Sequence, residues 1–301
     1  MRDDLPKPRA GEVILDIREV SGRRFLTPLI SAALLASLAV GALVRWQNHQ
    51  TAATARPQTG GVAAAPSPAE RPGWTLTFAD EFGGDTLDTS RWLDSYPNGE
   101  RTHSNNEQQY YAPYGATVRD GYLCFTAERR SEGGMPYTSG MVSSYGKFAQ
   151  QYGRFEIRAR FPKGKGLWPA FWLLPETRAW PPEIDVVEIV GHKPNEALLS
   201  HHWRESGAGG RRHVWQTKTF TGPDFCAEDF HTFAVEWGPD EIVWYVDDVE
   251  RHRATHNVPR EPMYVLANLA VGGDLPGMPD ETTPFPAVME VDYIRVYQRL
   301  P

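Results

Sequence analysis

The stretch that decides the fold class is Gly153-Arg154-Phe155-Glu156-Ile157-Arg158-Ala159-Arg160-Phe161, in which apolar and charged side chains alternate. Successive side chains of a β-strand point to opposite faces, so this pattern predicts a strand with one buried face and one exposed face. The same period of two recurs in the ranges 232–237, 241–246 and 289–297, and turn-forming Gly-Pro, Pro-Asp and Asp-Gly steps lie between such runs. We find no long amphipathic helix and no internal repeat. The sequence therefore predicts an antiparallel all-β sandwich.

The chain of 301 residues changes in composition near Trp74. Residues 45–73 are rich in Ala, Pro, Thr and Gly with almost no large apolar side chain, which predicts a disordered linker. Residues 74–301 hold nearly all the aromatic residues, and their 22 Lys/Arg against 32 Asp/Glu give a net charge of −10. This length fits one sandwich domain, expected to be a monomer. Its acidic balance argues against nucleic acid as a partner.

A segment near the N-terminus has the properties of a membrane anchor. Residues 25–44 carry no charge, and a helix of that length rises about 30 Å, enough to cross a bilayer core. Six Lys or Arg precede it and two follow within residues 45–60, a bias that keeps the N-terminus cytoplasmic. We therefore expect a cytoplasmic leader at 1–24, a single-pass anchor at 25–44 and a periplasmic or extracellular domain. Alternatively, cleavage after the small-x-small pattern Ala53-Thr54-Ala55 would secrete the protein.

Three carboxylates fall within six residues in Glu183-Ile184-Asp185-Val186-Val187-Glu188. In a regular strand Glu183 and Asp185 share a face, whereas Glu188 points to the other one. A β-bulge between Asp185 and Glu188 would bring all three to one face, where like charges are costly unless they share protons. The alternative is a solvent-facing edge strand, although its valines and isoleucines make it unusually apolar for that position. From the pattern alone, a catalytic site and an edge strand both stay open.

An aromatic run lies just upstream, in Gly166-Leu167-Trp168-Pro169-Ala170-Phe171-Trp172-Leu173-Leu174-Pro175. Its alternation places Trp168 and Trp172 on one face, with Phe171 and Leu173 on the other. Two tryptophans on one sheet face offer a flat platform for the apolar face of a sugar ring, and Trp180 is a third candidate. Packing within the core is the alternative for each of them.

Together these motifs resemble glycoside hydrolase family 16, and within it the laminarinase-type β-1,3-glucanases. The resemblance covers nearly all of residues 74–301. The acid motif has the additional residue that separates the laminarinase-like branch from the lichenase-like pattern E-x-D-x-E. Further matching segments are 80–82, 105–111, 137–140, 152–156, 202–203, 230–232, 268–273 and 291–297. The resemblance implies a β-jelly-roll sandwich with a concave cleft for an extended polysaccharide.

The resemblance also implies roles for individual residues. Glu183 matches the nucleophile, Glu188 the general acid/base, and Asp185 the helper between them. Substrate-binding positions match Asn106, Trp168, Trp172, Trp180 and His202. The implied function is a retaining endo-acting hydrolase of β-1,3 or mixed β-1,3/1,4 glucan, which forms a covalent glycosyl-enzyme. Such an enzyme needs two carboxyl groups about 5 Å apart and no catalytic cofactor.

A structural calcium on the convex face is a further implication of the resemblance. The matching oxygen donors are Glu81, the backbone of Gly121, and Asp292. The alternative is that Glu81 only makes surface hydrogen bonds. Cys124 and Cys226 either pair in an oxidising compartment or remain two free thiols.

Two departures from the family pattern concern the substrate. Met141 stands where many laminarinases carry Arg, and Asp274-Leu275 stand where they often carry Asn-Trp. The linkage and the sugar therefore stay open. One alternative is a hydrolase or transglycosylase acting on another polymer, such as a galactan or an exopolysaccharide. The other is a non-catalytic carbohydrate-binding jelly roll.

Overall fold

A computed structural model describes residues 12–13, 70–207, 210–227 and 229–301. The chain forms two compact units, and the first consists of Met1–Asp16 with Ala65–Pro301. The second unit, Ile17–Ala64, lies outside the described residues, and so does the predicted membrane anchor. Among the residues that are described, no helix has the length and apolar character needed to cross a membrane.

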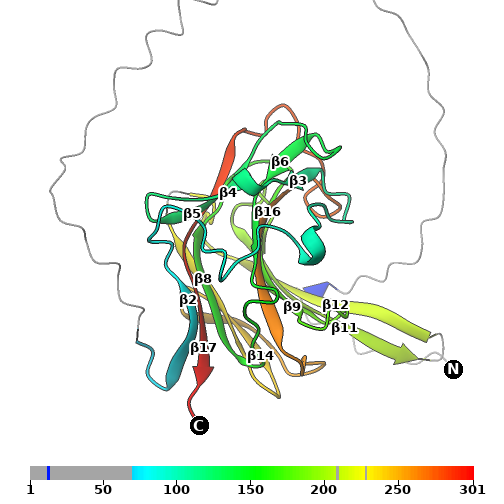
Figure 1. The fold of residues 1–301 in the computed structure, drawn as a ribbon. Helices are drawn as coiled ribbons and strands as arrows, with labels where there is room; N and C mark the ends of the chain where they lie inside the picture. Colours follow the sequence, from blue (N-terminus) through cyan, green and yellow to red (C-terminus); the bar gives the residue numbers. More distant parts are fainter. Residues whose placement is uncertain (1–11, 14–69, 208–209, 228) are drawn as a thin grey trace, which may run out of the picture. The chain divides into compact units, whose positions relative to one another are not determined.

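Two antiparallel sheets contain most of the strands among the described residues of the first unit (Figure 1). The strand order of the seven-stranded sheet is β1-β12-β11-β10-β9-β16-β7, with the bounds β1 (Glu12–Val13), β7 (Met141–Ser143), β9 (Leu167–Pro175), β10 (Glu183–Ile189), β11 (Glu196–Gly207), β12 (Gly210–Thr221) and β16 (Met263–Val271). Its edge strand β1 falls within the predicted leader and pairs with β12 through two residues. The long hairpin of β11 and β12 projects from the rest of the sheet (Figure 1).

The second sheet has eight strands in the order β15-β14-β13-β8-β17-β5-β4, with β2 added alongside β17. Its bounds are β2 (Trp74–Asp80), β4 (Ala116–Arg119), β5 (Tyr122–Ala127), β8 (Gly153–Arg160), β13 (His231–Trp237), β14 (Ile242–Val246), β15 (Val249–Ala254) and β17 (Ala287–Arg299). A parallel pair, β3 (Gln109–Tyr111) with β6 (Tyr137–Ser139), and two 3-10 helices, η1 (Pro97–Gly99) and η2 (Pro113–Gly115), lie beside the sheets. The predicted all-β antiparallel architecture is confirmed.

One hydrophobic core joins the two sheets. It includes Phe155 and Ile157 from β8 of one sheet, and Phe171 and Leu173 from β9 of the other. The alternation read from residues 153–161 is therefore real, because the apolar side chains of β8 enter this core. A second apolar cluster, which contains Trp172, uses the residues of β9 that alternate with the core residues. It lies on the outer face of the seven-stranded sheet.

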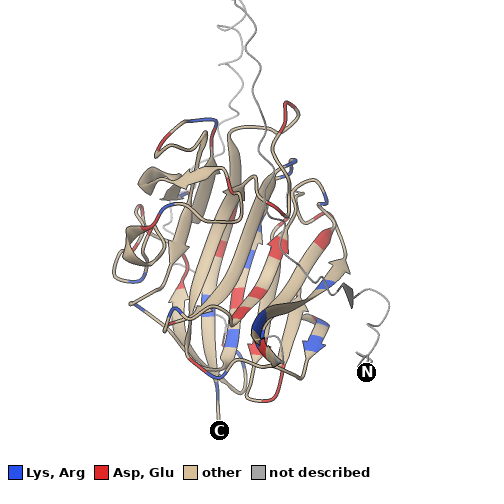
Figure 2. Ribbon diagram, turned by 90° about the vertical axis from the view of Figure 1, so that its right-hand side faces the viewer, with Lys and Arg blue, Asp and Glu red and all other residues tan. Residues whose placement is uncertain are grey.

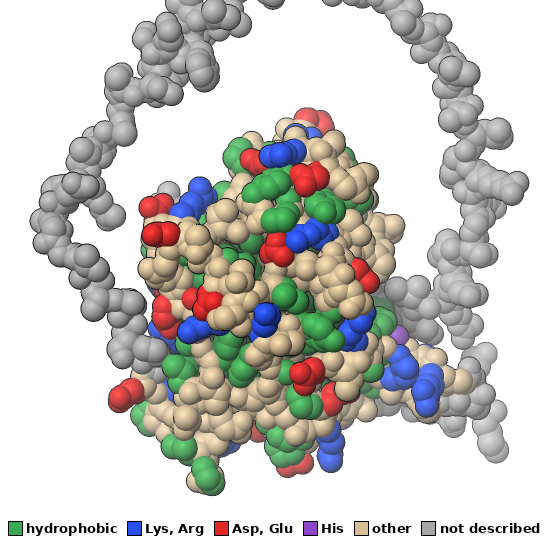
Figure 3. Space-filling model, viewed as in Figure 1, with side chains coloured by type: hydrophobic (Ala, Val, Ile, Leu, Met, Phe, Trp, Pro, Cys, Tyr) green, Lys and Arg blue, Asp and Glu red, His purple; other side chains and the backbone are tan. Residues whose placement is uncertain are grey.

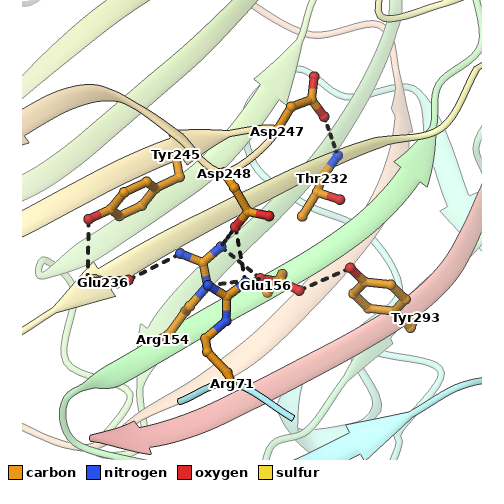
Figure 4. Close-up of polar contacts among 9 residues, drawn as sticks. All are labelled: Arg71, Arg154, Glu156, Thr232, Glu236, Tyr245, Asp247, Asp248 and Tyr293. Carbon is orange, nitrogen blue, oxygen red and sulfur yellow. Dashed lines mark hydrogen bonds and ion pairs between the residues drawn. The ribbon is translucent and has the colours of Figure 1, made fainter. Parts of the chain in front are cut away.

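The charged side chains of β8 cover the outer face of the eight-stranded sheet, where arginines and carboxylates pair (Figure 4). Arg154 is only 1% exposed and donates to Glu156 at 2.8 Å, Glu236 at 3.2 Å and Asp248 at 2.7 Å. Arg71 donates to Glu156 at 3.1 Å and to Asp248 at 3.0 Å. Arg71 belongs to the predicted linker, so the ordered contacts of the domain begin slightly before Trp74.

The two cysteines are not paired. Cys124 is buried in β5, and Cys226 is half-buried between β12 and β13. Burial raises the pKa of Cys226 to about 12, which keeps it a neutral thiol. Of the two alternatives open from the sequence, two free thiols is the one the structure bears out.

Candidate active site

The acid motif forms β10, and the register of this strand shifts within the motif. Toward β11, Asp185 pairs with Ser200 and Glu188 with Leu198, so β10 carries one more residue than its partner. The register against β9 shifts in the same place. This is the predicted bulge. It turns Glu188 to the face occupied by Glu183 and Asp185, while the intervening valines stay buried in the core.

Two tryptophans and one histidine contact the three carboxyl groups. The Trp180 indole N–H donates to Glu183 Oε2 at 2.7 Å, and the Trp168 indole N–H donates to Glu188 Oε1 at 3.0 Å. His202 Nε2 lies 3.0 Å from Asp185 Oδ2 and 3.6 Å from Glu183 Oε1. One polar atom from each of Glu183, Asp185 and His202 falls within a cluster only 4.8 Å across. Acidic segments accordingly gather near the middle of the view in Figure 2.

Burial raises the pKa of every carboxyl group in this cluster, and the charges of neighbouring acids add to the rise for Glu183 and Glu188. For Glu188, burial comes first, followed by the Asp185 charge, and together they hold its pKa well above the usual range. Burial and then Asp185 likewise raise the pKa of Glu183, but His202 and the Trp180 N–H oppose that rise. Burial also raises the pKa of Asp185. The cluster therefore retains protons that isolated carboxylates would lose near neutral pH, and Glu188 is the group best suited to hold one.

The tryptophans differ in what they offer to a ligand. Trp168 and Trp172 point to the outer face as expected, but Trp172 is only 9% exposed, and its N–H donates to Asn268 Oδ1 at 2.7 Å. Trp180 is 47% exposed. The exposed aromatic surface beside the acids is therefore mainly that of Trp180, while Trp172 packs in the floor beneath.

Asn106 and both departures from the family pattern lie near the same face. Asn106 is exposed, and its amide N–H donates to Asp274 Oδ1 at 2.6 Å, so one departure directly contacts a predicted substrate-binding residue. Leu275 is 45% exposed. Met141 is buried in the second apolar cluster with Trp172. At these positions this face therefore has a methionine in place of the arginine of the family pattern, and an aspartate and a leucine in place of its asparagine and tryptophan.

Sequence reasoning missed three residues of this site: Asn268, His213 and Trp215. Asn268 bridges Trp172 and the Tyr111 hydroxyl, to which its amide N–H donates at 2.9 Å. His213 and Trp215 share a face of β12 beside His202. The alternation of His213, Val214 and Trp215 in the strand after His202 was a usable signal. The hairpin carries three exposed arginines, Arg204, Arg211 and Arg212. Basic side chains, in blue, are visible at the right of Figure 3.

The predicted calcium donors do not form a suitable site. Glu81 accepts hydrogen bonds from Arg295 at 2.8 and 2.7 Å, and Asp292 accepts one from Arg158 at 2.5 Å. Both carboxylates are therefore neutralised by arginines, whereas calcium needs free oxygen ligands. Gly121 lies in the turn between β4 and β5. The alternative, in which Glu81 makes hydrogen bonds within the protein, is the arrangement observed.

The sequence of residues 98–295 matches the glycosyl hydrolases family 16. The chain belongs to this family. The family 16 domain is similar to endo-1,3-1,4-beta-glycanase ExsH of Rhizobium meliloti, with 40% identity over 245 residues. That match covers 73% of this chain and 51% of the relative, so the chain spans about half the relative's length.

Two further relatives match over most of their length. The beta-glucanase of Rhodothermus marinus is 35% identical over 257 residues, which are 75% of this chain and 86% of that protein. The catalytic domain of an endo-1,3-beta-glucanase (laminarinase) from Thermotoga petrophila RKU-1 superposes with a TM-score of 0.65 at 36% identity. It covers 76% of this chain and 99% of that domain. The family and the laminarinase-like branch inferred from the motifs are thus confirmed.

Proposed function

We propose that this family 16 domain is a retaining endo-β-glucanase that cleaves β-1,3 or mixed β-1,3/1,4 glucan. The observation that carries the proposal is the bulge in β10, which sets Glu183, Asp185 and Glu188 on one face. Placing three carboxyl groups close together in a largely buried position lowers the stability of the fold. Such clusters with perturbed pKa values are typical of reactive sites rather than of purely structural strands. The named activities of the relatives support the choice of glucan as substrate.

The arrangement assigns one task to each acid. Glu183, as a carboxylate, attacks the anomeric carbon while Glu188 donates its proton to the leaving glycosidic oxygen, which yields a covalent glycosyl-enzyme. Glu188, now a carboxylate, takes a proton from water, and that water releases the sugar and frees Glu183. Asp185 lies between them and helps to keep the proton on Glu188 through its charge. Trp180 and Trp168 hold the two glutamates by hydrogen bonds, and the outer face of the seven-stranded sheet receives the polysaccharide.

The test is the release of reducing ends from laminarin by the soluble fragment 70–301. Glu183→Gln keeps the shape of the side chain but removes the nucleophile, so we expect the rate to fall by at least about 10³-fold. Glu290→Gln, which alters an acid on the opposite sheet bonded to Arg160, is the matched control and should retain activity. Full activity of Glu183→Gln would refute the assignment.

Product analysis separates hydrolysis from transfer to a sugar acceptor. Mass spectrometry of a digest supplemented with a labelled oligosaccharide should show labelled chains of the original length or shorter if water is the acceptor. Labelled chains longer than the added oligosaccharide would identify a transglycosylase. Inactivity on glucans together with turnover of a galactan or an exopolysaccharide would assign another polymer, and binding without turnover of any glycan would indicate a carbohydrate-binding module.

For the full chain we propose a single-pass anchor at 25–44 with the leader in the cytoplasm and the domain exported. The support is the uncharged segment and the excess of Lys and Arg before it. A cytoplasmic leader cannot pair with β12, so this topology requires β1 to be unpaired in the anchored protein. Protease added outside intact spheroplasts should digest the domain but spare an N-terminal tag. A soluble product that begins near residue 55 would show cleavage and secretion instead.

A further inference from the structure

His213 contacts two neighbours of the proposed nucleophile, Trp180 and His202. Its Nε2 lies 2.8 Å from His202 Nδ1, and the two rings lie edge to edge in nearly one plane, with their centroids 5.1 Å apart and their planes inclined by only 8°. Its other side meets the Trp180 ring at a centroid distance of 4.4 Å. Trp215, whose ring centroid is 5.2 Å away, stacks against His213. The imidazole is therefore held by aromatic contacts as well as by a hydrogen bond.

His202 depends on His213 for one of its two ring nitrogens. Its Nε2 is engaged by Asp185, and its Nδ1 points to His213. If His202 is neutral with its proton on Nε2, Nδ1 accepts a hydrogen bond from His213 Nε2–H. If His202 is charged, Nδ1–H donates to the lone pair of His213 Nε2. A neutral imidazole can serve in either case, because it exists in two tautomers.

His213 has the electrostatic surroundings that such a partner needs. Burial, His202 and Arg204 lower its pKa to about 4, so His213 stays neutral over the range in which the acids titrate. The charged groups that face the pair are Arg204 from β11 and the carboxyls Glu183, Asp185 and Glu188 from β10. The carboxyl groups nearest to His202 therefore come from β10, and His213 contributes a neutral partner.

We propose that His213 is a positioning residue that holds the His202 imidazole against Asp185 and Glu183 in both protonation states of His202. This inference rests on the proposed glycosidase function. Without His213, His202 has an unpaired Nδ1 and can rotate, and the contacts that help to keep Glu183 a carboxylate become intermittent. His213 acts through His202 and Trp180 and does not itself touch the reacting atoms.

Two variants separate the hydrogen bond from the packing. His213→Phe keeps a flat ring between Trp180 and Trp215 but cannot bond to His202. His213→Gln places an amide that can donate or accept near the position of Nε2. We expect His213→Phe to lower kcat by roughly 10- to 100-fold with little change in KM, because small displacements of a reacting group are costly. The acidic limb of its pH profile should move to higher pH, since Glu183 loses support for its charged form. His213→Gln should stay within about threefold of the unaltered enzyme, and so should the hairpin control Arg212→Ala.

Full activity and an unchanged pH profile in His213→Phe would overturn the proposal, and so would a glutamine variant as impaired as the phenylalanine one. A loss confined to KM would also overturn it, because it would mean a substrate contact. Nitrogen-15 NMR of the unaltered protein gives a test that does not depend on variant folding. The ring nitrogens of His202 and His213 should respond together as pH changes, and independent titration would refute the pairing. Activity in Glu183→Gln, in contrast, would refute the glycosidase assignment while leaving this pairing measurable.

Discussion

Strands β8 and β10 both set charged side chains on an outer face of the sandwich, but their charges meet different partners. On β8, Arg154 and Glu156 are almost fully buried and bond to each other and to neighbouring opposite charges (Figure 4). On β10, the acids meet indole N–H groups and one histidine. Asp185 is as deeply buried as Arg154 and Glu156, whereas Glu183 and Glu188 are partly exposed. Compensation by opposite charge is what separates a structural network from a reactive one.

This difference in partners accounts for the raised pKa values of the carboxyl groups on β10. Burial raises the pKa of all three carboxyl groups of β10, and like charges raise those of Glu183 and Glu188 further. Glu156 and Glu236 instead accept charge-assisted hydrogen bonds from the Arg154 guanidinium. The acids of the β8 network therefore lie beside arginines, whereas the acids of β10 lie beside one another and retain protons more readily.

The largest expected effect separates activity from stability on β10. Glu188→Gln removes the proton donor, so kcat on laminarin should fall by about 10²- to 10⁴-fold. The melting temperature should not drop, because one of three mutually repelling groups is gone. An aryl β-glucoside oligomer whose leaving group needs no protonation is the control, since its first step should survive. A strongly destabilised Glu188→Gln would mean that Glu188 supports the fold in the manner of the β8 acids.

On β8 we expect a substitution to lower stability and leave activity unchanged. Arg154→Met leaves Glu156 with fewer partners in a buried position and should lower the free energy of unfolding by roughly 3 kcal/mol, with kcat unchanged at a temperature where the variant is folded. Arg158→Met is the matched control on the same strand. Arg158 is 38% exposed and bonded to Asp292, so its loss should cost less than about 1 kcal/mol. Urea unfolding followed by tryptophan fluorescence measures both; equal costs would contradict the contrast.

A smaller effect is expected on the pH profile when Asp185 is neutralised. The Asp185 charge raises the pKa of Glu188, so Asp185→Asn should lower that pKa. Glu188 then loses its proton at lower pH, and the basic limb of kcat/KM should move down by about one pH unit. Asp292→Asn, on the other sheet, should leave the limb in place. A basic limb that stays where it is, or moves upward, would exclude Asp185 as the source of the shift.

The smallest expected effect tests the edge of the β8 network. Arg71→Ala removes bonds to Glu156 and Asp248, but Arg154 still reaches both acids. We expect a loss below about 1 kcal/mol in the free energy of unfolding and unaltered kinetics, with Arg71→Lys in between. A loss as large as that of Arg154→Met would make Arg71 an equal member of the network.

Much of this site could be predicted because its elements are local in sequence. The bulge follows from spacing, since three acids in Glu183 to Glu188 can share a face only if one extra residue is inserted. The outward face of Trp168 and Trp172 follows from alternation. Neither pattern could show that Trp172 packs against Asn268 or that His213 contacts His202, because those contacts join strands whose register is set by the whole sheet.

The all-β class, the family and the identity of the three acids follow from the sequence, since side-chain period and residue spacing are properties of one strand. Which charges are compensated depends on the packing of the strands against one another. In the folded chain, Glu81 and Asp292 each bond to an arginine, and Cys124 and Cys226 stay unpaired. The β10 acids instead contact indole N–H groups and an imidazole. The physical reason is that a pKa depends on neighbours within a few ångströms, and in a sheet most of those neighbours come from other strands.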